Sequence, residues 1–224
     1  MRKHWRRIRD HWNRTDTVVM ATNHAALGVF VANCWWHSPI VCQLASAVPL
    51  AFQIRRAVRS DRLLRDALVF GAIIGFAWPV GEGLVTAVFG WWGQYLAAGI
   101  TIWHTPLYCI LIGWLASTHL YYLSHRLEAI GYGRISGVAV VGLTAFGMGL
   151  LGENLFVWAN MWRYDTSGLD WWAIPAFVPV AYGVGYAILP LLNRWRAEAT
   201  ALACGAVLIV TCVGFGLASG FFPR

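Results

Sequence analysis

Long apolar runs alternate with short polar segments along the whole chain. Several of these runs approach or exceed the roughly 20 apolar residues that a helix needs to cross a bilayer, and one of the seven, residues 39–52, is shorter. They predict helices over residues 17–36, 39–52, 67–90, 96–122, 135–157, 171–192 and 199–222. The pattern therefore predicts an all-α, polytopic bundle of seven transmembrane helices.

The basic residues are confined to particular segments between these runs. All Lys and Arg residues except Arg163 and Arg224 lie in the N-terminal segment or after the second, fourth and sixth runs. Basic loops stay on the cytoplasmic side of a membrane, so this distribution predicts a cytoplasmic N-terminus and a C-terminus on the other side. We expect residues 1–16 to be a basic cytoplasmic segment, either an amphipathic surface helix or a simple anchor. Residues 17–224 then form a single transmembrane domain.

Composition supports the membrane interpretation. The chain is 58% hydrophobic and 12% charged, against roughly 25% charged residues in a soluble domain. The formal net charge of +7 does not indicate nucleic acid as a partner, because the basic residues lie between the apolar runs as topology signals. The five cysteines are scattered without metal-ligand spacing, so neither a metal nor another cofactor is expected. We expect an integral protein of a bacterial inner membrane.

Two segments of the chain carry the same motif residues in the same order. A Gly-Glu pair ends with Glu82 in the first copy and with Glu153 in the second, and Trp91 or Trp162 follows nine residues later. In both copies a Trp-x-x-Pro segment then opens the next apolar run. The copies cover the third and fourth runs and the fifth and sixth runs, which cross the membrane in the same directions. The sequence therefore predicts a parallel repeat of helical hairpins.

The two glutamates of the repeat are the acidic residues that fall inside predicted spans. A charge at membrane depth costs about 2.5–3.5 kcal/mol on insertion scales, and no Lys or Arg within a span would neutralise it. Such a carboxyl group tends to keep its proton, which is the form that a general acid needs. Glu82 and Glu153 are therefore candidate acids. The alternative is a structural role in which each protonated Glu ties two helices together by a hydrogen bond.

Aromatic residues gather towards the end of the bundle where both glutamates lie. Aromatic faces stabilise cations, so these rings are candidates for the wall of a substrate cavity, although packing and anchoring at the membrane interface would also explain single residues. His104 is a candidate for orienting Glu82 or relaying a proton. Asp165 is either a solvated loop acid or a second acid or base over the cavity mouth. The candidate wall residues are Trp78, Trp91, Trp92, Trp103, Tyr108, Trp158, Trp162, Trp172 and Tyr182.

This combination resembles the integral-membrane terpene cyclases, which include cyclases of fungal meroterpenoid pathways, heterodimeric-type lycopene cyclases and related carotenoid hydratases. The resemblance covers roughly residues 78–190 and rests on the two Gly-Glu pairs, on Trp91 and Trp162, and on the two Trp-x-x-Pro segments. The acidic Pro-Glu-Glu-type motif of the carotenoid cyclases is absent. The resemblance implies a seven-span enzyme without a cofactor, in which an acid protonates an isoprenoid. Glu82 is then the first candidate acid and Glu153 the second.

We therefore expect an isoprenoid cyclase or hydratase-like enzyme that protonates a lipophilic alkene or epoxide taken from the bilayer. Its expected partners are that substrate and membrane lipids, and a homo-oligomer or a larger membrane complex is compatible with the sequence. One alternative is a pigment-binding or scaffold subunit of a photosynthetic membrane complex, in which His24 or His119 binds a pigment or haem. Another is a proton-coupled transporter with Glu82 and Glu153 as proton carriers.

Overall fold

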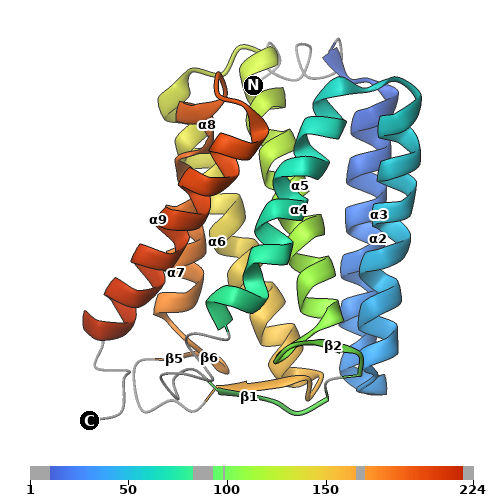
Figure 1. Cartoon of the computed structure of the whole chain (residues 1–224), viewed down its shortest axis with the longest axis vertical. Helices are drawn as coiled ribbons and strands as arrows, with labels where there is room; N and C mark the ends of the chain where they lie inside the picture. Colours follow the sequence, from blue (N-terminus) through green and yellow to red (C-terminus); the bar gives the residue numbers. More distant parts are fainter. Residues whose placement is uncertain (1–10, 83–92, 98, 165–169, 219–224) are drawn as a thin grey trace.

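The computed structural model describes residues 11–82, 93–97, 99–164 and 170–218, and helices dominate this part of the chain. Figure 1 shows the helices running along one axis, with the strands gathered at its lower end. The helices are α2 (Arg14–Trp36), α3 (Pro39–Ser60), α4 (Arg62–Glu82), α5 (Leu107–Ala129), α6 (Arg134–Trp158), α7 (Phe177–Ala187), α8 (Leu189–Leu192) and α9 (Ala197–Ala218). The strands are β1 (Gly93–Tyr95), β2 (Thr101–Ile102), β3 (Thr105–Pro106), β4 (Trp162–Tyr164), β5 (Asp170–Trp171) and β6 (Ile174–Pro175).

Five of these helices, α2, α4, α5, α6 and α9, are long and apolar enough to cross a membrane. Helix α3 is of similar length, but it continues past residue 52 and carries Arg55, Arg56 and Arg59 near its end. Helices α7 and α8 form a shorter apolar stretch, Phe177–Leu192. The mostly helical architecture is thus confirmed, whereas the number of seven spans and the cytoplasmic N-terminus stay predictions.

Two helices begin later than the apolar pattern predicts, which corrects the fourth and sixth predicted spans. Helix α5 begins at Leu107 instead of residue 96, and α7 begins at Phe177 instead of residue 171. The residues in front of them form two short hairpins, in which β2 pairs with β3 and β5 pairs with β6. The Trp of each Trp-x-x-Pro segment is the first turn residue, with φ of 56° at Trp103 and 60° at Trp172. A bulky residue rarely adopts this left-handed conformation, so the motif marks a chain reversal and not the start of a helix.

The two copies of the repeat meet through strands β1 and β4. These strands pair antiparallel, with Gln94 opposite Arg163 at the centre and Tyr95 opposite Trp162 beside it. Gln94 and Arg163 each lie nine residues before the Trp of the hairpin in their own copy. The pairing therefore places equivalent positions of the two copies, Gln94 and Arg163, opposite each other. In Figure 1, α4 and α6 both run downwards to the strands, as the predicted parallel repeat requires.

Glycines bring the two helices of each copy close together. A Cβ atom on Gly75 of α4 would lie 2.7 Å from the carbonyl oxygen of Ile110 in α5. A Cβ atom on Gly142 of α6 would lie 3.2 Å from the carbonyl oxygen of Gly183 in α7. Small residues allow such close packing between membrane helices. The main buried apolar cluster, which includes Phe70, extends around these helix pairs.

The start of α2 is capped by its own side chains. Asn13 Oδ1 accepts hydrogen bonds from the backbone N–H groups of Thr15 at 2.7 Å and Asp16 at 2.9 Å. Asp16 Oδ2 in turn accepts the N–H of Asn13 at 2.8 Å, which completes a capping box. This cap explains why the helix begins at Arg14 and not at residue 17.

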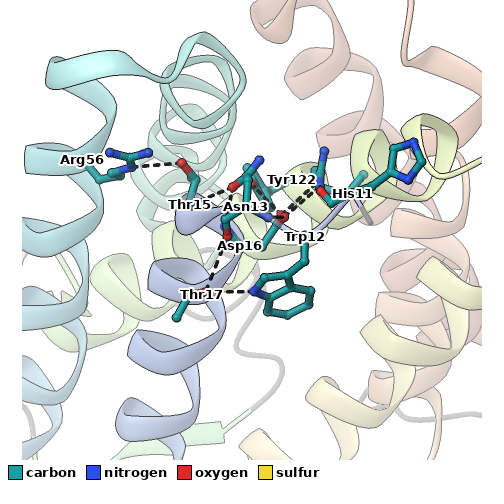
Figure 2. Close-up of polar contacts among 9 residues, drawn as sticks. His11, Trp12, Asn13, Thr15, Asp16, Thr17, Arg56 and Tyr122 are labelled. Carbon is teal, nitrogen blue, oxygen red and sulfur yellow. Dashed lines mark hydrogen bonds and ion pairs between the residues drawn. The ribbon is translucent and has the colours of Figure 1, made fainter. Parts of the chain in front are cut away.

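Asp16 also fastens this end of α2 to α5 (Figure 2). Its carboxylate accepts two hydrogen bonds from the Arg126 guanidinium, at 2.8 Å from Nε and 2.7 Å from a terminal nitrogen. The Tyr122 hydroxyl donates a third at 2.9 Å, and Arg126 also donates to the carbonyl of His11. Arg56 of α3 donates to the Thr15 hydroxyl at 3.0 Å. Three helices are therefore joined by polar contacts at the end of the bundle opposite the strands.

Candidate functional site

Glu153 lies near the strand end of α6 and is held by two phenol groups. The Tyr164 hydroxyl of β4 donates to Oε2 at 2.8 Å, and the Tyr182 hydroxyl of α7 donates to Oε1 at 2.9 Å. Within the part of the chain that the structure describes, Glu153 forms no ion pair. Both carboxyl oxygens are thus bound by neutral donors that come from two different elements.

Close packing fixes the ring of Tyr182. A Cβ atom on Gly149, one turn before Glu153 in α6, would lie 2.7 Å from Cδ2 of that ring. The same ring stacks on Trp78 of α4, with centroids 6.0 Å apart and planes 10° from parallel. The next residue after the acid, Asn154, accepts the backbone N–H of Ala173 at 2.8 Å and so ties the second hairpin to α6. Contacts to α7 and to the second hairpin therefore hold the part of α6 that carries Glu153.

A largely apolar cavity of about 510 Å³ opens beside Glu153. Its volume lies within the range of roughly 300–1,000 Å³ that is usual for small-molecule sites. Helices α2, α5 and α6 supply most of its wall, and the remainder comes from α3, α4, α7, α9, β1, β4 and Ala159 after α6. Its lining residues in α2 extend from Asn23 to Asn33, so the space follows the bundle axis, and its apolar wall suits a lipophilic ligand.

The cavity reaches the outside of the bundle between α2 and α6. These helices contact each other near the strands, where the Cys34 thiol donates to the carbonyl of Leu155. Nearer the middle of the bundle, several residues that line the cavity are also exposed on the surface. They are His24 and Leu27 from α2 and Leu143, Gly147 and Leu151 from α6. We call this opening the lateral mouth. On membrane-spanning helices, such an opening faces lipid.

Aromatic rings surround the cavity around Glu153. Trp162 lies between two tyrosines, with centroid distances of 4.4 Å to Tyr95 and 5.3 Å to Tyr164. Tyr108 is fully buried, and its ring stacks on Phe156 at 5.8 Å. All five rings line the cavity. Their faces can stabilise a positive charge that develops near the acid.

The structure brings five of the predicted site residues together. Glu153, Trp78, Tyr108, Trp162 and Tyr182 all line the cavity. His24 and His119, the residues of the alternative pigment hypothesis, line it too. The cavity therefore contains candidate residues of both the cyclase hypothesis and the pigment-binding hypothesis.

Four other predicted residues lie away from this cavity, which corrects their expected position. Trp103, Trp158 and Trp172 are exposed, and none of them is among the residues that line it. His104 is exposed beside Trp103, as its neighbour in the hairpin turn. For Trp103, His104 and Trp172 the physical reason is the hairpin turn, which directs these side chains outwards, whereas Trp158 is the last residue of α6. Interface anchoring suits such exposed tryptophans.

The remaining predicted residues lie outside the described part of the chain. They are Trp91, Trp92 and Asp165. Glu82 is the last residue of α4, and its side chain is also outside the described part. The assignment of Glu82 as a candidate acid therefore stays a prediction.

Sequence reasoning missed the two tyrosines of the strands as site residues. Tyr164 binds Glu153 directly, and Tyr95 packs on Trp162 in the same wall. Each lies eight residues before the Trp of the hairpin in its own copy. Aligning the copies on the Trp-x-x-Pro segments would have placed these tyrosines at equivalent positions and singled them out.

Comparison of the chain with protein-family models, with curated proteins and with solved structures finds no match.

Proposed function

We propose that this protein is an integral-membrane enzyme that protonates a lipophilic isoprenoid alkene or epoxide and controls the carbocation that forms. The observation that carries this proposal is Glu153, which lies in the wall of an apolar cavity, bound by two phenols and surrounded by aromatic rings. We place the protein in a bacterial inner membrane, and the distribution of basic residues supports a cytoplasmic N-terminus there. The resemblance to membrane terpene cyclases supports the same class of reaction.

The reaction begins with the protonated Glu153. The π electrons of the substrate alkene take the carboxyl proton, which forms a C–H bond and leaves a carbocation and a carboxylate. A second alkene of the same molecule then attacks the cation and closes a C–C bond. Glu153 takes back a proton from a neighbouring carbon, so the net reaction is an isomerisation. In a hydratase, water adds to the cation and its surplus proton returns to Glu153.

Tyr164 and Tyr182 stabilise the Glu153 carboxylate that forms when the proton is transferred. Each phenol donates to one of the two carboxyl oxygens, and donors placed before the reaction stabilise a charge as it develops. A hydrogen bond to a charged group contributes about 1.5–3 kcal/mol. The two phenols thus make the loss of the proton easier without any basic residue.

The lateral mouth gives a lipid-soluble substrate a direct path into the cavity. Gly147 lines the mouth, and a Cβ atom there would meet nothing within 4 Å. Gly147→Leu is therefore expected to leave the fold intact but to narrow the mouth, and to lower kcat/KM for a bulky isoprenoid about tenfold. Gly28→Leu is the matched control, because Gly28 of α2 also has free space but does not line the cavity. Equal activity of both variants in an assay of product formation would contradict access by this route.

One observation favours a second candidate function, the binding of a pigment. Nδ1 of His24 lies 2.7 Å from the carbonyl oxygen of Met20, so it carries a proton and leaves the Nε2 lone pair available. A metal-binding histidine typically makes this kind of contact to a backbone carbonyl. An absorption spectrum and an organic extract of the detergent-purified protein separate the two functions. We expect a colourless protein that carries an isoprenoid lipid, and a visible chromophore would support the pigment instead.

A further inference from the structure

The cavity has a second polar group, away from Glu153. Asn23 of α2 and His119 of α5 both line it, and Asn23 Nδ2 lies 3.3 Å from His119 Nδ1. The same amide nitrogen donates to the carbonyl oxygen of Val19 at 2.7 Å. A carbonyl can only accept, so this contact fixes the orientation of the amide and places its N–H groups towards Val19 and His119.

The orientation of Asn23 in turn determines the tautomer of His119. Nδ1 must accept the amide proton, so in a neutral ring Nε2 carries the hydrogen and is a donor. In the part of the chain that the structure describes, Nε2 of His119 has no hydrogen-bond partner. This arrangement differs from that of a typical metal-binding histidine, whose second nitrogen donates a hydrogen bond. His119 is therefore suited to donate to an oxygen atom of a ligand.

His24 provides the complementary group. It follows Asn23 in α2 and lines the same cavity. Its Nδ1 donates to the carbonyl of Met20, so Nε2 of a neutral His24 is an acceptor. This end of the cavity thus offers one donor and one acceptor. A hydroxyl group, which both donates and accepts, matches the pair.

The helices indicate how far this polar end lies from the acid. Helices α2 and α6 run in the same direction in Figure 1, and Cys34 contacts the carbonyl of Leu155. Glu153, two residues before Leu155, therefore lies level with about residue 32 of α2. From there to Asn23 the helix rises about 13 Å, at 1.5 Å per residue. The two polar ends are separated by the length of an extended lipid segment, with apolar wall between them.

We infer that Asn23, His24 and His119 form a binding site for a hydroxyl group at one end of an isoprenoid ligand. This inference rests on the proposed function, because it identifies the substrate class of the same cavity as an isoprenoid alcohol. The hydroxyl accepts from His119 Nε2 and donates to His24 Nε2. Its chain follows the apolar wall, and an alkene about 13 Å away then lies at Glu153. The site therefore sets which double bond receives the proton.

Three probes of similar shape test the hydroxyl site: farnesol, its methyl ether and the hydrocarbon farnesene. Binding to the detergent-purified protein is followed by quenching of tryptophan fluorescence, since Trp78 and Trp162 line the cavity. The alcohol can make both hydrogen bonds, the ether one and the hydrocarbon neither. We expect farnesol to bind at least tenfold more tightly than farnesene, with the ether between them. In His119→Phe and in His24→Phe, farnesol loses one of its two hydrogen bonds. Its advantage in affinity over farnesene should therefore fall to that of the methyl ether or lower.

His125→Phe is the matched control for His119→Phe. It changes the same residue type on the same helix, outside the cavity, and His125 Nε2 is buried without a hydrogen-bond partner among the described residues. It should keep the preference for the alcohol. If His119→Phe fails to fold, Asn23→Leu, which removes the partner that sets the tautomer, takes its place and should weaken the preference too.

The outcomes separate this inference from the proposed function. Equal binding of all three probes to the unchanged protein would overturn the hydroxyl site and leave the acid at Glu153 untouched. Glu153→Gln should keep the preference for farnesol while losing turnover, because the two ends are far apart. Retained turnover in that variant would overturn the proposed function alone. No binding of any probe, or a bound pigment that His24→Phe releases, would overturn both.

Discussion

Replacing Glu153 with Gln is expected to lower the turnover of an isoprenoid substrate about 1,000-fold, because general acid catalysis contributes roughly 10²–10⁴-fold. Gln has nearly the same shape and can still hydrogen-bond to the hydroxyls of Tyr164 and Tyr182, which bind the carboxyl oxygens. It has no proton to give to an alkene. The folded protein should therefore remain, and only the chemistry should be lost. Product formation measured by mass spectrometry, together with a circular dichroism spectrum, checks both parts.

Two further glutamates make this result interpretable. Glu128→Gln is the control, because Glu128 lies at the end of α5 opposite the strands and accepts a hydrogen bond from Asn193. It should leave turnover unchanged. Glu82→Gln, measured in parallel, shows whether the other candidate acid of the repeat contributes to the same step. Normal turnover in Glu153→Gln would contradict the assignment of the acid, whatever the Glu82 variant does.

The second large effect is expected on stability, from Asp16→Ala. Asp16 is buried, and its carboxylate binds the Arg126 guanidinium through two hydrogen bonds and the Tyr122 hydroxyl through a third (Figure 2). Removing one partner of a buried ion pair costs about 3–5 kcal/mol, because the other charge stays buried without a counter-charge. The change also removes the capping box of α2. For a chain of this size, the midpoint of thermal unfolding should fall by about 10 °C.

Asp66→Ala is the matched control for this stability measurement. Asp66 also pairs with an arginine, Arg62, but at 4.0 Å, with the Arg62 side chain largely exposed and the Asp66 side chain about half exposed. An exposed pair contributes less than about 1 kcal/mol, so its removal should shift the midpoint only slightly. Thermal unfolding of both variants in the same detergent, followed by circular dichroism, gives the comparison. Equal shifts would show that the Asp16 cluster does not hold α2 to α5.

The apolar runs predicted the helices well but not the hairpins. In a membrane, a run of 20 apolar residues satisfies its backbone hydrogen bonds most readily by forming a helix. Helices such as α6 therefore appear close to their predicted bounds. The fourth and sixth runs include residues 96–97, 99–106 and 171–176, which are largely apolar but fold as hairpins or loops. Their helices are shorter than the runs because Trp103 and Trp172 adopt a left-handed conformation that local hydrophobicity does not encode.

The site was predictable where a residue type was unusual for its surroundings. A carboxyl group inside an apolar run singled out Glu153 without any structure. Its partners could not be predicted in the same way, since Tyr164 reaches it only because β4 folds back beside α6, and Tyr182 comes from another helix. The sequence presents His24 and His119 only as separate candidate ligands of a pigment. Their common cavity depends on the packing of α2 against α5, which the sequence pattern does not specify.

The central claim, that Glu153 gives its proton to a carbon atom of an isoprenoid, is tested most directly by turnover in heavy water. The carboxyl proton exchanges with solvent, so the unchanged protein should place one deuterium on a carbon of the product for each turnover of an acyclic isoprenoid alkene. Glu153→Gln should give no labelled product. Product that carries no carbon-bound deuterium, or equal labelling by the Gln variant, would contradict the account.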